Sequence, residues 1–183
     1  MTNKAWLGIG AVAVTLVASG TVLAQQRVLA EATLVHQDDC IDSEVEIFVQ
    51  ANSANRGTFE VSAFEIDTCA EEDGVLLDAR GRGNLAQGGF SFDGRRAVLN
   101  TTVQLRDALT RNAVSMELDL TWVGGEQVVA TTRRDIQSRG RFARANRGLT
   151  RTLAEAEASG TVAVDGRGLF DGSSDDATIW TIR

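Results

Sequence analysis

Arginine is concentrated in one short stretch of this chain. Seven arginines and a single acidic residue, Asp135, lie between positions 133 and 151. The seven are Arg133, Arg134, Arg139, Arg141, Arg144, Arg147 and Arg151. A guanidinium group binds a carboxylate or a sulfate through two parallel hydrogen bonds. The stretch therefore predicts a site for an anionic polymer or for another protein, centred on Arg139, Arg141, Arg144 and Arg147.

An acidic stretch earlier in the chain supports a different interpretation of the same arginines. Twelve acidic residues and one basic residue, Arg56, lie between Glu31 and Asp73. If strands from the two stretches are neighbours in a sheet, cross-strand ion pairs would neutralise the arginines inside the fold. The sequence leaves open whether the arginines face a partner or the chain's own acidic strands.

Two phenylalanines extend the predicted binding surface. Phe48 and Phe64 occur among charged residues, on the predicted solvent-facing side of their strands. Exposed aromatic side chains beside carboxylates can form a contact patch for a partner. We include both residues in the predicted ligand-binding site.

Acidic residues on predicted strands offer a hydrolytic alternative. The candidates are Glu44, Glu46, Glu60 and Glu65. Glycoside hydrolases use two facing carboxylates, and the only histidine, His36, is the one imidazole available as a general base. The sequence singles out neither a carboxylate pair nor a nucleophile. We therefore expect a non-catalytic binding or structural protein, with a small hydrolase as the alternative.

A third group of acids, near Gly172, raises the question of a calcium site. Asp171, Asp175 and Asp176 supply hard oxygen donors at close spacing, which calcium prefers. Their order differs from that of an EF-hand loop, and a solvated turn explains them as well. We expect no metal and no other cofactor.

The first residues have the three parts of a secretory signal. Lys4 is followed by an apolar run from Ala5 to Val17 and by small residues up to Ala24. The run is too short and too broken for a membrane-spanning helix, which needs roughly 20 apolar residues. The sequence predicts a signal peptide over 1–24 and one exported domain over 25–183, secreted or periplasmic and without stable membrane insertion.

Two cysteines, Cys40 and Cys69, belong to the predicted exported domain. An even count in an exported chain predicts a disulfide. The domain has a net charge of −8, because the chain's −7 includes the Lys4 of the signal peptide. An acidic domain disfavours binding to nucleic acid, so the expected partner is an anionic polymer or another exported protein.

Period-two alternation is the main structural signal, and it predicts antiparallel strands. The clearest case is the segment from Val114 to Trp122, in which every second residue is apolar. Glycine-bearing breaks such as 81–83, 124–125 and 166–172 separate the alternating segments. The prediction is an all-β, antiparallel β-sandwich or barrel-like domain of about nine or ten short strands after an N-terminal signal helix. An outer-membrane barrel is not expected, because tyrosine is absent and many strands carry a charged face.

Residues 152–158 alternate but also contain strong helix formers. We favour a strand, because the segment joins smoothly to the strand predicted after Gly160. As a strand, its small residues Ala154, Ala156 and Ala158 would let Trp122 pack closely against them. The same stripe of small residues would leave room inside a barrel for an apolar ligand. A lipocalin-like carrier is therefore a further hypothesis.

Overall fold

The computed structural model describes residues 26–52, 56–71, 74–85, 89–137 and 144–182. These residues form nine antiparallel strands and contain no helix, which confirms the predicted all-β class. The predicted signal peptide lies outside the described residues. No helix that could span a membrane occurs in the ranges given above.

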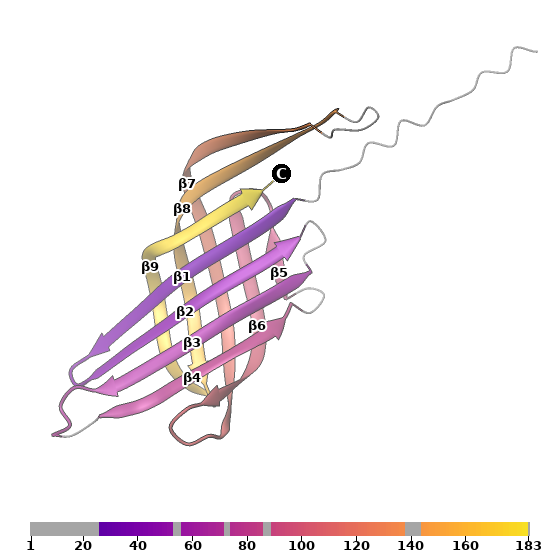
Figure 1. Ribbon diagram of the computed structural model, residues 1–183. Helices are drawn as coiled ribbons and strands as arrows, with labels where there is room; N and C mark the ends of the chain where they lie inside the picture. The colour runs from indigo at the N-terminus through magenta and orange to yellow at the C-terminus, as the bar shows by residue number, and fades with distance from the viewer. Residues whose placement is uncertain (1–25, 53–55, 72–73, 86–88, 138–143, 183) are drawn as a thin grey trace, which may run out of the picture.

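The strands form two crossing layers (Figure 1). The front layer contains β1 (Arg27–Asp38), β2 (Ile41–Asn52), β3 (Gly57–Asp67) and β4 (Val75–Asn84). The remaining strands are β5 (Phe90–Phe92), β6 (Arg96–Asp107), β7 (Ala113–Gln137), β8 (Arg144–Val164) and β9 (Arg167–Ile182).

All nine strands belong to one sheet with the order β4-β3-β2-β1-β9-β8-β7-β6-β5. β4 also pairs with β6, through Ala79 opposite Asp107 and Arg80 opposite Arg106. The order of strands therefore returns to its beginning. β1 and β9 join the two layers through six residue pairs, from Arg27–Ile182 to Ala32–Ala177.

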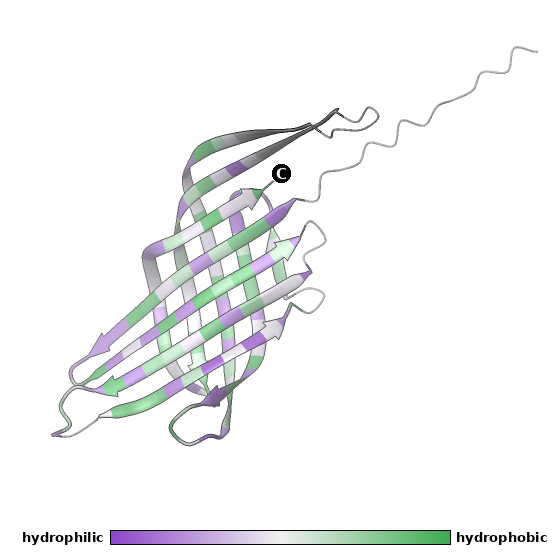
Figure 2. Cartoon of the chain, in the orientation of Figure 1, coloured by the Kyte–Doolittle hydropathy of each residue, from purple (hydrophilic) through white to green (hydrophobic). Residues whose placement is uncertain are grey.

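Alternating residues point into and out of this sheet (Figure 2). Leu34, Val45, Leu99 and Leu120 are fully buried, whereas their chain neighbours lie on the outer face. Trp122 is also fully buried, and its indole Nε1 donates a hydrogen bond of 2.9 Å to the Glu31 carbonyl of β1. This bond connects the two layers through the core and satisfies a polar atom that burial would otherwise penalise.

Residues 152–158 belong to β8, so the strand prediction is confirmed. Trp122 lies directly across from Ala158, which is itself fully buried. The small side chain leaves space for the indole ring, as the alternation predicted.

The strands are not all short, because several predicted glycine breaks lie inside strands. β7 has 25 residues and contains Gly124 and Gly125, and β8 has 21 residues. Gly83, predicted to be part of a break, lies within β4, where an added Cβ would come within 2.4 Å of the Phe59 ring. This glycine therefore makes room for a core aromatic residue rather than ending a strand.

The disulfide between Cys40 and Cys69 is present, as predicted. It links the turn between β1 and β2 to the segment that follows β3. The backbone N–H of Thr68 also donates to the Cys40 carbonyl at 2.7 Å. A disulfide of this kind is typical of extracellular and periplasmic proteins.

Asp107 lies at the contact between β4 and β6, opposite Ala79. Its buried carboxylate accepts hydrogen bonds from the Leu109 and Thr110 backbone N–H groups, and from the Thr110 hydroxyl at 2.6 Å. The Asp78 N–H of β4 donates to it at 3.4 Å. These donors, the Thr110 hydroxyl above all, hold the pKa of Asp107 below its ordinary value of 3.8, against the opposing effect of burial.

We predict that Asp107→Ala lowers the free energy of unfolding by about 1–3 kcal/mol, because it leaves buried donors without an acceptor. The contribution of the carboxylate is complete above the ordinary pKa of 3.8 and is lost as pH falls through the lowered pKa. The gap between wild type and variant, measured by urea unfolding, should therefore narrow below that pH. Exposed Glu117→Ala serves as the control. Equal stability of wild type and Asp107→Ala at pH 7 would contradict this role.

Candidate functional site

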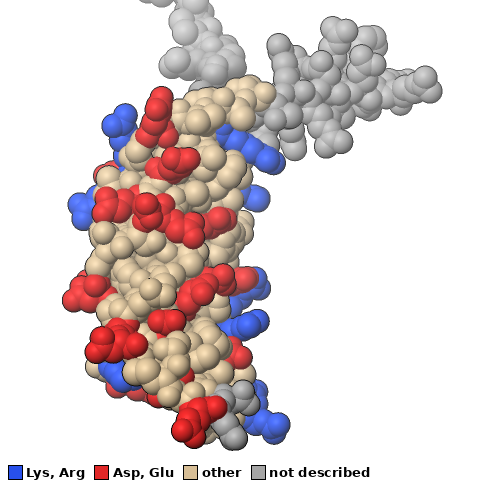
Figure 3. Space-filling view, turned by 90° about the vertical axis from the view of Figure 1, so that its left-hand side faces the viewer, with Lys and Arg blue, Asp and Glu red and all other residues tan. Residues whose placement is uncertain are grey.

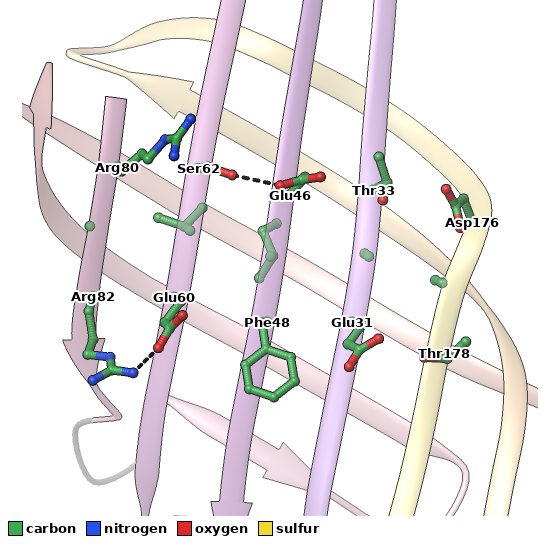
Figure 4. A pocket seen from close by; sticks show the side chains of 15 residues that line it. Glu31, Thr33, Glu46, Phe48, Glu60, Ser62, Arg80, Arg82, Asp176 and Thr178 are labelled. Carbon is green, nitrogen blue, oxygen red and sulfur yellow. Dashed lines mark hydrogen bonds and ion pairs between the residues drawn. The ribbon is translucent and has the colours of Figure 1, made fainter. Parts of the chain in front are cut away.

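A groove of about 740 Å³ crosses the outer face of five neighbouring strands, β9, β1, β2, β3 and β4 (Figure 4). Its fifteen lining residues form three cross-strand rows of five. The two outer rows point their side chains away from the sheet. The middle row, which is Ala177, Ala32, Ile47, Val61 and Gly81, belongs to the inward-facing set and forms the floor.

Phe48 lies at the centre of one outer row. It is half-buried, and Glu31 of β1 and Glu60 of β3 lie directly across from it on either side. Thr178 and Arg82 complete the row at its two ends. The arrangement places an aromatic ring between two carboxylates, which is a surface suited to a cationic group.

The second outer row adds further carboxylates. It contains Asp176, Thr33, Glu46, Ser62 and Arg80. The Ser62 hydroxyl donates to Glu46 at 3.0 Å. This row therefore has one acidic group at its centre, Glu46, between the hydroxyls of Thr33 and Ser62, and a second, Asp176, at its β9 end.

Only part of the negative charge of the groove is neutralised within the chain. Arg82 is paired with Glu60, and Arg80 Nε lies 3.7 Å from Asp78, which is outside the groove. Among the residues whose side chains are described, which are those given above without 132–137 and 144–149, none donates a hydrogen bond to the carboxylates of Glu31 and Asp176. The end of the groove formed by β9 and β1 therefore carries negative charge that no described side chain neutralises.

Phe64 lies on the same outer face of β3 but not in the groove. Its side chain is 41% exposed, and it stands across from Glu44 of β2 and Asp78 of β4. The structure thus separates the two predicted aromatic residues: Phe48 is in the groove, and Phe64 is beside it.

The four candidate catalytic carboxylates do not share one face. Glu44, Glu46 and Glu60 are exposed on the outer face, whereas Glu65 is buried on the inner face. Both oxygens of Glu65 accept hydrogen bonds of 2.5 Å from Arg167 at the start of β9. The Glu65 carboxylate raises the pKa of Arg167 through these bonds, although burial of the guanidinium opposes the shift. Glu65 is committed to an ion pair between two distant parts of the chain.

The remaining candidates for chemistry lie on exposed strand positions. His36 is near the end of β1, across from Ser43. Asp171, Asp175 and Asp176 are exposed in β9. In the described part of the chain, three potential metal ligands converge only at Cys40, Asp67 and Cys69. The two cysteines there are joined in the disulfide, so this group offers no thiolate ligands.

The described residues of the arginine-rich stretch lie in β7 and β8, where these two strands project beyond the rest of the sheet (Figure 1). Described residues 131–137 of β7 and 144–150 of β8 pair only with each other. The ladder to β6 ends at Val123, and the ladder to β9 ends at Arg151. We call this projecting ribbon, residues 131–137 with 144–150, the arm.

Four of the clustered arginines lie on arm strands, namely Arg133, Arg134, Arg144 and Arg147. Arg134 is the register partner of Arg147. Arg151 is exposed at the base of the arm. Arg139 and Arg141 lie outside the described residues. The acidic strands β1, β2 and β3 are not sheet neighbours of the arm, so cross-strand pairing with them does not occur in these ladders.

Charge is thus divided between the arginine-rich stretch, residues 133–151, and the rest of residues 25–183, which we call the body. Residues 133–151 contain seven arginines and one acid, a net charge of +6. The rest of residues 25–183 contains ten arginines and twenty-four acids, a net charge of −14. Figure 3 shows that acidic side chains spread over the side of the body that is at the left in Figure 1, with basic ones at its margins.

The interior of the sheet is packed with apolar side chains. Trp122, Phe59, Phe90 and several leucines are fully buried and belong to one continuous cluster. The carrier hypothesis requires an interior cavity, whereas the groove and the arm both lie on the outside.

Comparison of the chain with protein-family models, curated proteins and solved structures finds no match in any of the three.

We predict that Arg167→Ala lowers the free energy of unfolding by about 1–3 kcal/mol, because it leaves the buried Glu65 without its partner. Replacing both members, as in Glu65→Leu with Arg167→Ala, should restore most of the loss. Urea unfolding of the two variants measures this directly. A double variant no more stable than Arg167→Ala would show that the ion pair is not what holds these segments.

Proposed function

We propose that this chain is an exported, non-catalytic interaction protein that binds a carboxylate- or sulfate-bearing partner through its arginine-rich arm. One observation carries the proposal: the arm strands pair only with each other in the described ladders. Arginines inside a sheet next to acidic strands would be neutralised by their neighbours. The arm strands that carry Arg133, Arg134, Arg144 and Arg147 have no acidic strand as a sheet neighbour, which supports binding to an external anion.

The body supports this function as a rigid base. We propose that it is a closed barrel rather than an open sandwich, because the β4–β6 pairs return the strand order to its start. Closure removes edges that would otherwise pair with other chains. Export supplies the oxidising conditions that the disulfide requires, and it agrees with the predicted signal peptide.

We predict that the protein is retained at low salt on columns bearing poly-glutamate or dextran sulfate and is released as salt screens the charges. The variant Arg134→Gln, Arg144→Gln, Arg147→Gln should elute at clearly lower salt than wild type, because it removes three guanidinium groups from the arm. Comparison of the two columns shows whether carboxylate or sulfate is the better ligand.

A matched control removes the same charge from the body. Arg27, Arg96 and Arg106 are exposed, and their replacement by Gln changes the net charge equally. This control should remain as well retained as wild type. The proposal is overturned if the arm variant and the body control elute together, since binding would then depend on net charge rather than on the arm.

A further inference from the structure

We infer that the partner of the arm is the acidic groove of a second copy of this chain. The inference rests on the proposed function, since it names the anionic surface that the arm recognises. The groove and the arm lie on different parts of the molecule, and none of the fifteen groove residues comes from the arm. The arm of one copy can therefore bind a second copy while the groove of the first binds the arm of a third.

Charge complementarity identifies a second copy as the occupant. Residues 133–151, to which most of the arm belongs, have a net charge of +6, and the rest of residues 25–183 has a net charge of −14. The basic stretch of one copy is therefore attracted to the acidic surface of another. Within the groove, Glu31 and Asp176 have no hydrogen-bond donor among the residues whose side chains are described, and Glu46 has only the Ser62 hydroxyl. Arginines are the side chains that pair best with such carboxylates.

The dimensions of the two surfaces agree. The groove crosses five strands, which at the usual strand spacing is about 19 Å. The arm has seven residue pairs beyond its last contact with β9, from Thr131–Thr150 to Gln137–Arg144, and at the usual rise this is about 23 Å. The two outer rows of the groove are separated by two residues along each strand, roughly 7 Å, which admits a row of long side chains.

Apolar contacts support the same occupant. Val128 and Val129, at the base of the arm, are 64% and 61% exposed. They are consecutive residues of β7, opposite Leu153 and Thr152 of β8, so one apolar side chain is exposed on each face of the strand next to the arm. Phe48, half-buried at the centre of the groove, offers a complementary apolar surface with carboxylates on either side. A guanidinium that enters between those carboxylates would also lie against the aromatic ring.

An arm-to-groove contact joins two different surfaces, so it is heterologous. Such contacts produce rings or open chains of subunits rather than closed two-fold dimers. We therefore expect wild-type protein to form assemblies larger than dimers at low salt, and these should dissociate as salt screens the ion pairs.

The test uses two variants of the mature protein and sedimentation velocity at low salt. The groove variant is Glu31→Gln, Glu46→Gln, Asp176→Asn, and the arm variant is Arg134→Gln, Arg144→Gln, Arg147→Gln. Each alone should weaken self-association by about tenfold or more, from the loss of three exposed ion pairs. Mixed in equal amounts, they should form a one-to-one complex and nothing larger, because only one intact arm and one intact groove remain to meet.

A second acidic variant controls for net charge. Glu117→Gln, Asp119→Asn, Glu157→Gln removes three exposed carboxylates from β7 and β8, away from the groove. It should associate like wild type. The inference is overturned if wild type is monomeric at low salt, if the control weakens association as much as the groove variant, or if the mixture forms no complex.

The column experiment separates this inference from the proposed function. The groove variant keeps its arm, so it should still be retained on poly-glutamate. If retention depends on the arm but no groove-dependent association is found, the proposed function stands and the second copy is not the partner. If the arm variant is retained like its body control, the proposed function itself fails.

Discussion

The structure depends on the alternation of side chains in a sheet whose strand order returns to its beginning. The two residues of each cross-strand pair point their side chains to the same face of the sheet. The register therefore fixes which side chains face the core on every strand from β4 through β1 and β9 to β6. The middle row of the groove illustrates the consequence. Ala32, Ile47 and Val61 point inward and belong to the core, while their backbone forms the floor of the groove outside. The same strand pairing therefore places apolar side chains in the core and polar side chains in the groove.

The same constraint separates the charges. Buried positions in the described residues are almost all apolar. The exceptions are Ser43, Glu65 and Asp107; Glu65 is paired with Arg167, and Asp107 accepts hydrogen bonds from Leu109 and Thr110. The acidic side chains consequently collect on the outer face of the body. Most of the clustered arginines lie apart from these acids. They belong to the part of the hairpin where β7 no longer pairs with β6 and β8 no longer pairs with β9; those ladders end at Val123 and Arg151. This separation of an acidic body from a basic projection is the basis of our inference that copies associate through unlike surfaces.

Local patterns predicted the elements but not their neighbours. Period-two alternation was enough to place Trp122 on a buried face, and the cysteine count was enough to predict the disulfide. The groove could not be predicted, because it depends on the register between segments as distant as Thr178 and Arg82. Glu65 was placed among the candidate catalytic acids, although it shares the parity of Phe59, Val61 and Ala63, and that parity signals its inward position. Strand lengths were underestimated because glycines within strands resemble turns.

Cross-linking tests the central claim most directly, since residues 25–183 contain no lysine. In an Arg147→Lys variant, the new amine and the N-terminus are the only amines that can be coupled to a carboxylate by a zero-length reagent. The sample would be an equal mixture of 14N and 15N protein. We expect cross-links from position 147 to Glu31, Glu46 or Asp176 in which the two peptides carry different isotopes about half of the time, as random mixing of copies requires. Cross-links confined to peptides of one isotope, or formed mainly with acids outside the groove, would contradict it.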